Sequence, residues 1–78
     1  MPKLPVVKTR ELIRILNRIG FFEHNQVGSH AQFKHLDGRR VTVPLHYGRD
    51  IKTGTLRGIL NDIDVSVEEF ISVLKKKK

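Results

Sequence analysis

Two short segments of alternating apolar and polar residues flank the dipeptide Asp37-Gly38, and this arrangement restricts the fold more than any other feature of the sequence. An Asp-Gly pair between alternating segments is among the strongest short-range signals for a β-hairpin. We therefore predict strands at about residues 30–35 and 39–43. Because side chains alternate between the two faces of a sheet, one face of this hairpin should be apolar and the other polar.

The alternation assigns the side chains of the hairpin to those two faces. Four apolar residues are expected to face the core: Ala31, Phe33, Val41 and Val43. Five residues then share the solvent-facing side: His30, Gln32, Lys34, Arg40 and Thr42. Pro44 should close the second of these strands, because proline has no N–H to donate to a ladder hydrogen bond.

An amphipathic helix is predicted before the strands. Its apolar residues recur at helical spacing: Leu12, Ile13, Leu16 and Ile19. Thr9 is the expected N-cap of this helix, and Gly20 is expected to end it. Its opposite face is basic, with Arg10, Arg14 and Arg18, and would contact phosphates, an acidic protein or solvent alone. A further strand is expected over residues 21–27.

Two helices should follow the strands. The first has apolar residues in helical register, Leu56, Ile59, Leu60 and Ile63, with Thr53 or Thr55 as its cap. The second is short: residues 66–69 form a capping box, and Phe70, Ile71 and Leu74 supply an apolar face. The predicted fold class is α+β, in the order α-β-β-β-α with a short C-terminal helix. Its three-stranded antiparallel sheet has the helices on one face.

The size and charge of the chain limit where function can lie. We expect a single domain over residues 1–78, too small for a deep cavity, so any site should be on the surface. The formal net charge is +7, and it falls to +3 without the four lysines at 75–78, which are expected to form a flexible basic tail. A basic excess favours nucleic acid or an acidic protein as the partner, with solubility as the plainer explanation.

Several classes of protein are disfavoured by the same sequence. There is no cysteine, and no apolar run approaches the roughly 20 residues that span a bilayer. The N-terminal residues also lack the apolar core of a secretory signal, so we expect a cytoplasmic protein without membrane association. The four histidines are separated by 6, 5 and 11 residues, which matches no compact ligand motif. We therefore expect no metal and no cofactor.

Four short motifs follow one another along the chain. They are Gly20-Phe21, Gly28-Ser29-His30, Val43-Pro44-Leu45-His46 and Gly54-Thr55-Leu56. In this order and spacing the sequence resembles the HicA family of mRNA interferases over residues 20–74, about 70% of the chain. The resemblance implies a fold like that of a double-stranded RNA-binding domain. It also implies a toxin of a toxin–antitoxin pair that cleaves messenger RNA and binds a HicB-type antitoxin.

The resemblance gives the catalytic role to His30. RNA carries its own nucleophile, the 2′-hydroxyl, so cleavage needs one proton removed there and one supplied to the leaving 5′-oxygen. Histidine suits both tasks because its side chain titrates near neutral pH. Gly28 would permit close approach of the RNA. Ser29 would hydrogen-bond a phosphate oxygen or orient the strand edge.

Other residues are candidates for supporting roles. Four basic side chains are expected to stabilise charge on the phosphate: Lys34, Arg39, Arg40 and Lys52. His46 would act as the partner acid or base, contact the substrate, or hold the loop in place. The remaining histidines, His24 and His35, match no motif and are expected simply to be exposed.

The chain departs from the family pattern at one place, and two other functions are consistent with the same sequence. Many family members carry basic residues just upstream of Gly-Ser-His, where this chain has Asn25 and Val27. Phosphate contacts should therefore be sought on the neighbouring strands and on the loop after Pro44. The rival functions are a non-catalytic RNA-binding module of the double-stranded RNA-binding type and a small adaptor that contacts only protein.

Overall fold

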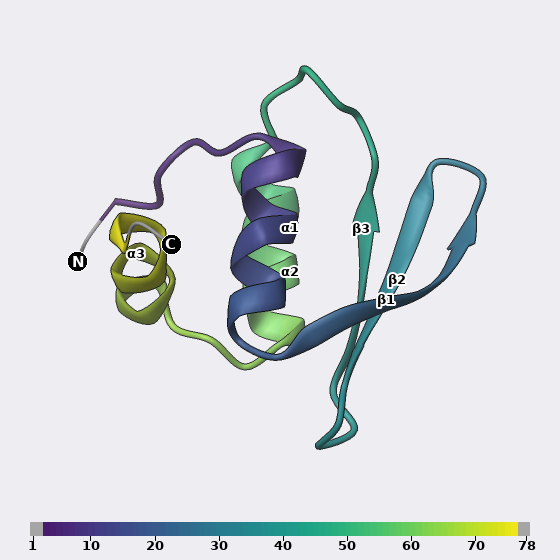
Figure 1. Cartoon of the computed structure of the whole chain (residues 1–78). Coiled ribbons are helices and arrows are strands. Elements are labelled where there is room, and N and C mark those ends of the chain that lie inside the picture. Colours follow the sequence, from purple (N-terminus) through teal and green to yellow (C-terminus); the bar gives the residue numbers. More distant parts are fainter. Residues whose placement is uncertain (1–2, 77–78) are drawn as a thin grey trace.

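The computed structural model describes residues 3–76 as a three-stranded sheet packed against helices (Figure 1). The elements, in chain order, are α1 (Thr9–Arg18), β1 (Phe21–Val27), β2 (His30–His35), β3 (Arg40–Pro44), α2 (Thr53–Asp62) and α3 (Val67–Lys75). The strands are antiparallel and lie in the order β1-β2-β3. The predicted α+β class and element order are confirmed, and the topology is consistent with a double-stranded RNA-binding-domain-like fold.

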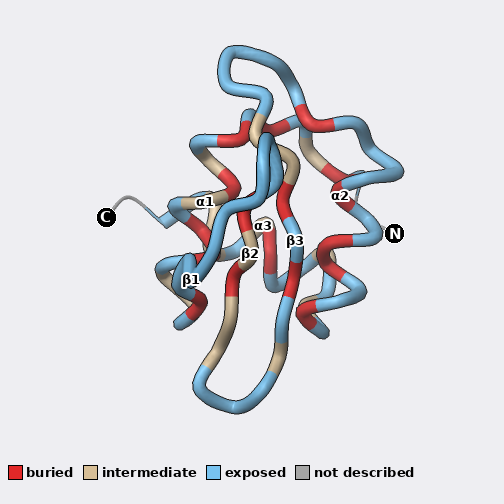
Figure 2. The backbone as a smooth tube through the Cα atoms, turned by 90° about the vertical axis from the view of Figure 1, so that its right-hand side faces the viewer, coloured by how far each residue is buried: buried red, intermediate tan, exposed pale blue. Residues whose placement is uncertain are grey.

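The helices leave one face of the sheet open. Helices α1 and α2 lie side by side against the sheet, whereas α3 packs on their far side (Figure 1). Figure 2 looks onto the sheet from its open side, with α1 and α2 behind the strands. No described helix covers this face, so the side chains that point outward from the strands remain available to a partner.

The core lies between the sheet and the two central helices. The four hairpin residues predicted to face inward are all buried: Ala31, Phe33, Val41 and Val43. They meet Leu12 and Leu16 of α1 and the apolar stripe of α2 in one hydrophobic cluster. Full burial of each large side chain contributes about 1.5–3 kcal/mol relative to exposure. This burial fixes the register, because a one-residue slip would turn the apolar side chains to solvent.

The helix caps agree only in part with prediction. Ser66 caps α3: its hydroxyl accepts from the Glu69 backbone N–H at 3.1 Å, and the Glu69 carboxylate accepts from the Ser66 N–H at 3.2 Å. Thr9, in contrast, is not a cap. It is the first residue of α1 and is 1% exposed, and Lys8 occupies the N-cap position. The prediction was wrong because a local pattern cannot show that the Thr9 side chain is used in a long-range contact.

Helix α2 also begins without the predicted threonine cap. Its N-cap is Lys52, which makes no side-chain capping bond, and both Thr53 and Thr55 lie within the helix. At the other end of the chain, Lys75 is the last residue of α3, so the predicted flexible tail begins inside a helix. The last two lysines, at 77 and 78, lie outside the described residues. Among residues 3–76, no helix is both long and apolar enough to cross a membrane.

Candidate functional site

The open face of the sheet carries three rows of side chains. Residues paired across neighbouring strands point to the same face, so the strand register defines each row. The histidine row contains Val27, His30 and Pro44. The middle row contains Asn25, Gln32 and Thr42. The basic row contains Phe22, Lys34 and Arg40. The predicted solvent-facing set is therefore confirmed, with members of β1 added to it.

A two-residue turn presents His30 at the end of the open face. Gly28 and Ser29 join β1 to β2, and Gly28 has a φ of +59°, which glycine adopts without steric cost. A positive φ at the first loop residue only is the pattern of a type II′ hairpin. The Ser29 carbonyl accepts from the Leu45 N–H at 2.6 Å, which ties this turn to the chain that follows β3.

His30 itself is exposed and points away from the core. Within residues 3–76 its imidazole makes no hydrogen bond or ion pair with another protein group. Its row neighbours are Val27, which is 60% exposed, and the half-buried Pro44, neither of which can transfer a proton. Both ring nitrogens are therefore available to a ligand on this face.

The basic row lies at the opposite end of the sheet from His30. Lys34 is four residues further along β2, which corresponds to about 13 Å at roughly 3.3 Å per residue. Its partner Arg40 is exposed. The structure therefore does not bring Lys34 and Arg40 to the same phosphate as His30.

Arg39, another predicted phosphate contact, is used inside the protein. Its Nε donates to Asp37 Oδ2 at 2.8 Å, and its Nη1 donates to the Ile63 carbonyl. The guanidinium also lies over the Phe21 ring, 5.1 Å from the centroid. Arg39 thus links the β2–β3 turn to the end of α2, and its expected role as a phosphate contact stays a prediction.

Asp37 organises the same turn. Its carboxylate accepts from the Arg39 backbone N–H at 3.0 Å, and this bond is the main reason why the pKa of Asp37 lies below its ordinary value. Desolvation opposes the shift, whereas the side-chain hydrogen bond and the charge of Arg39 lower the pKa of Asp37 further, as does His35 when its ring is protonated. The ionised carboxylate is therefore part of the folded turn.

His35 is not the exposed histidine that the sequence suggested. Its Nε2 donates to the Ile19 carbonyl at 3.1 Å, and its Nδ1 accepts from the Asp37 N–H at 3.1 Å. A neutral ring with the proton on Nε2 satisfies both bonds. The ring also packs edge-on against Phe21, with centroids 5.0 Å apart. His35 thus joins the end of α1 to the β2–β3 turn.

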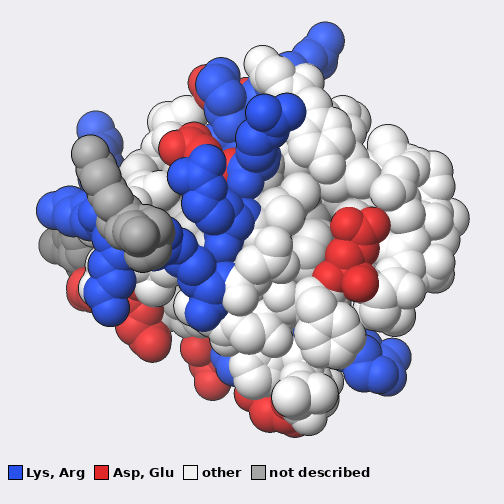
Figure 3. All heavy atoms as spheres, viewed as in Figure 1, with Lys and Arg blue, Asp and Glu red and all other residues white. Residues whose placement is uncertain are grey.

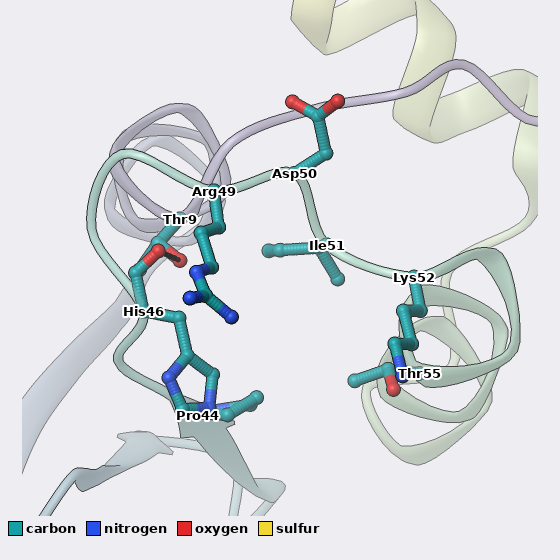
Figure 4. A pocket seen from close by; sticks show the side chains of 8 residues that line it. All are labelled: Thr9, Pro44, His46, Arg49, Asp50, Ile51, Lys52 and Thr55. Atoms are coloured by element: carbon teal, nitrogen blue, oxygen red, sulfur yellow. Dashed lines mark hydrogen bonds between the residues drawn. The ribbon is translucent and has the colours of Figure 1, made fainter.

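Beyond β3 the chain forms a hollow of about 330 Å³, which we call the loop hollow. Its lining residues are Thr9, Pro44, His46, Arg49, Asp50, Ile51, Lys52 and Thr55. In Figure 4 the Arg49 guanidinium points toward the His46 ring, and Lys52 and Thr55 stand on the other side of the hollow. The Asp50 carboxylate points away from the hollow and forms an ion pair with Lys8 at 3.1 Å.

The loop hollow unites two predicted site residues with three that the sequence analysis missed. His46 and Lys52 were expected to support catalysis, and both line it. Arg49, Thr9 and Thr55 were not assigned to a site. Arg49 stands in a polar loop between two motifs, and that position was the only signal for it. Thr9 lies 37 residues from His46, and no local pattern reports such a contact.

A second concentration of positive charge lies away from the open face. Figure 3 shows Lys and Arg side chains gathered over α1 on the side of the molecule seen in Figure 1. Helix α1 contributes the exposed Arg10 and Arg14 and the half-buried Arg18 to this region. Within the described part of the chain no three potential ligand side chains are placed to hold a metal ion.

The fold and the open face define a class: a small α+β protein with a histidine at a hairpin turn and basic side chains on and beside an uncovered sheet. Comparison with known families assigns it further. Residues 9–65 match the model of the family described as the HicA toxin of bacterial toxin–antitoxin systems. This match covers well over half of the 78 residues, and the chain belongs to the HicA toxin family. Membership implies a HicB-type antitoxin as partner. A search of the curated proteins found no match.

Proposed function

We propose that this protein is an endoribonuclease toxin that cleaves messenger RNA in the cytoplasm, with His30 as general acid or base and without a metal ion. The observation that carries the proposal is the state of His30. It is exposed on an open sheet face, beside the Gly28-Ser29 turn, with both ring nitrogens unused by the described protein groups. Membership of the HicA toxin family supports the same role.

The chemistry needs few protein groups. The 2′-oxygen attacks the adjacent phosphorus, and the bond from phosphorus to the 5′-oxygen breaks. His30 removes the proton of the 2′-hydroxyl or supplies one to the 5′-oxygen, and water or a second group completes the exchange. Positioned acid–base catalysis of this kind contributes about 10² to 10⁴-fold. His46, two residues beyond the row partner Pro44, is the second candidate for proton transfer.

Other residues on and beside the open face would support RNA binding rather than proton transfer. Gly28 has open space where a Cβ would stand, so a sugar or phosphate can approach the backbone of the turn. Ser29 is exposed beside His30 and offers a hydroxyl to a phosphate oxygen. Lys34 and Arg40 would contact phosphates one or more nucleotides away, because they stand at the other end of the open face.

The open face also suits a HicB-type antitoxin. Phe22 and Val27 are 42% and 60% exposed and lie in the same rows as Lys34 and His30. Apolar side chains interleaved with basic ones favour a partner that is both apolar and acidic. An antitoxin bound there would cover His30 and exclude RNA. The basic face of α1 is a second surface for an acidic segment of the same partner.

The decisive experiment compares wild type with His30→Ala. Induced expression should inhibit growth and degrade messenger RNA for the wild type only, and purified His30→Ala should bind RNA with nearly unchanged affinity. The control is His24→Ala, which removes an exposed histidine from the bulge of β1. Equal RNA degradation by wild type and His30→Ala would exclude His30 as the catalyst.

A non-catalytic RNA-binding module is the second candidate. One observation favours it: the histidine row holds no second group able to transfer a proton, since its other members are Val27 and Pro44. This candidate predicts salt-dependent RNA affinity without cleavage by the wild-type protein. An adaptor that contacts only protein predicts no such affinity.

A further inference from the structure

The loop hollow has the charge and shape of a site for an anion. Three of its lining side chains carry N–H donors: His46, Arg49 and Lys52. In Figure 4 the Arg49 guanidinium points toward the His46 ring, and the Lys52 and Thr55 side chains lie across the hollow from them, at the start of α2. Arg and Lys side chains are the usual partners of phosphate oxygens.

No carboxylate neutralises these groups within the described residues. Neither Arg49 nor Lys52 forms an ion pair or side-chain hydrogen bond with residues 3–76. The one acidic residue in the lining, Asp50, points outward and is paired with Lys8. Two positive charges, those of the exposed Arg49 and Lys52, therefore line the hollow without a paired carboxylate, and this arrangement favours an anion there.

The loop that forms the hollow is anchored along its length. The Leu45 N–H donates to the Ser29 carbonyl at 2.6 Å, and the Ile51 N–H donates to the Val7 carbonyl at 2.8 Å. Between these points, the His46 carbonyl accepts from the Arg49 N–H at 3.1 Å and from the buried Thr9 hydroxyl at 3.4 Å. Because the backbone is held, little ordering is needed when a ligand binds.

The hollow adjoins the candidate catalytic residue. Pro44 lines the hollow and is also the strand partner of His30, so the two features meet at one residue. We propose that the loop hollow is a phosphate subsite that holds an RNA backbone phosphate next to the one cleaved at His30, with Arg49, Lys52 and His46 as its donors. The proposal rests on RNA being the ligand of the open face, as proposed above.

The subsite is tested by binding rather than by cleavage. The probe is a short single-stranded oligonucleotide that is 2′-O-methylated throughout, which lacks the nucleophile and cannot be cut. Its affinity is measured by fluorescence anisotropy for wild type, Arg49→Gln/Lys52→Gln and the matched control Arg57→Gln. Arg57 is an exposed arginine of α2 that does not line the hollow. Thermal unfolding of each variant checks that the fold is kept.

We expect the double variant to lose about tenfold or more in affinity, as for lost charge-assisted hydrogen bonds. The slope of log K against log salt should become shallower by about 0.7, the contribution of one phosphate of a single strand. Arg57→Gln should stay within about twofold of wild type on the same scale. Equal affinities and slopes for the double variant and Arg57→Gln would overturn the subsite.

A second measurement locates the phosphate. Neutral methylphosphonate linkages are introduced one at a time along the oligonucleotide. One linkage, or two adjacent ones, should weaken binding to the wild type but not to the double variant, because both changes remove the same contact. Additive losses at every linkage would show that Arg49 and Lys52 act only as diffuse charge, and the proposal would fail.

The two proposals fail separately. If His30→Ala cleaves unmodified RNA as well as the wild type while the methylphosphonate effect persists, catalysis by His30 is excluded and the subsite stands. If His30→Ala abolishes cleavage while the double variant binds and cleaves like the wild type, the subsite is excluded and the catalytic role stands. Absence of any RNA affinity in the wild type would remove both.

Discussion

The two ends of β2 each carry a histidine, and the two side chains differ in every respect that matters for function. His30 is exposed on the open face and makes no hydrogen bond with the described residues. His35, five positions later, points to the helix side, and its side chain is only 21% exposed. Its two ring nitrogens are bonded to Ile19 and Asp37, and its ring packs on Phe21.

The difference shows that residue type does not determine the role of a histidine. An odd separation along a strand places the two side chains on opposite faces. One therefore meets solvent and the other meets α1 and the turn. A histidine whose donor and acceptor are both satisfied holds structure together, whereas an exposed histidine with both nitrogens unused can serve a substrate.

Replacing His30 should abolish activity and leave stability intact. We expect His30→Gln to lower the rate of RNA cleavage by about 10² to 10⁴-fold, since the acid–base group is lost. The free energy of unfolding should change by no more than about 0.5 kcal/mol, as for other exposed positions. Single-turnover cleavage and thermal unfolding measure the two effects. A large loss of stability would mean that His30, like His35, has a structural role in the folded protein.

Replacing His35 should lower stability and leave the cleavage activity of the folded protein unchanged. His35→Ala removes two hydrogen bonds and an edge-on aromatic contact, so we expect a loss of about 2–3 kcal/mol in the free energy of unfolding. Cleavage per folded molecule, measured well below the melting temperature, should stay near that of the wild type. A selective loss of activity in a fully folded variant would contradict the structural role.

Gly20 provides a way to disturb His35 without changing it. Gly20 has a φ of +100°, and a Cβ at this position would lie 2.6 Å from His35 Nε2. Gly20→Ala should therefore cost about 1–2 kcal/mol through backbone strain, and it should displace the His35 ring from the Ile19 carbonyl. Urea unfolding measures the cost, and NMR shifts of the His35 ring report the displacement. Gly54→Ala, whose Cβ would meet open space, is a control for the His35 shifts.

Asp37 should make a small, pH-dependent contribution. Its pKa is lowered in the folded state, first by the bond from the Arg39 backbone N–H, so the unfolded chain binds the proton more tightly. The stabilisation is therefore present above the unfolded pKa and is lost as the pH falls through the folded pKa. Asp37→Asn should lower the melting temperature slightly at neutral pH, and the two curves should converge in acid. A difference that persists in strong acid would show another cause.

Much of the fold could be predicted because it follows from local patterns. The bounds of β1 and β2 match the predicted ranges 21–27 and 30–35, since strand periodicity and glycine turns are written into neighbouring residues. The third strand begins at Arg40 rather than Arg39 and includes Pro44, which pairs with His30 as the last position of the ladder. The α3 capping box was equally local and was confirmed.

The candidate site was only partly predictable, because a site depends on which distant residues meet. The face of His30 follows from alternation, and its proposed role follows from a motif. The contacts of Arg39 and Thr9 do not follow from local sequence. Arg39 bonds to Ile63, 24 residues away, and Thr9 bonds to His46, 37 residues away. Sequence patterns of period two or 3.6 report faces of single elements and carry no information on such pairs.

The sequence by itself determined the order of the elements, the apolar and polar faces of the hairpin, and the position of His30 on the open side. Only the tertiary structure decided which basic side chains remain available to a ligand. In the folded protein, Arg39 and His35 pack against Phe21. His46, Arg49 and Lys52 line one hollow together with Pro44. The physical reason is that a charged side chain binds whichever partner the folded backbone places within reach, and chain separation does not limit that choice.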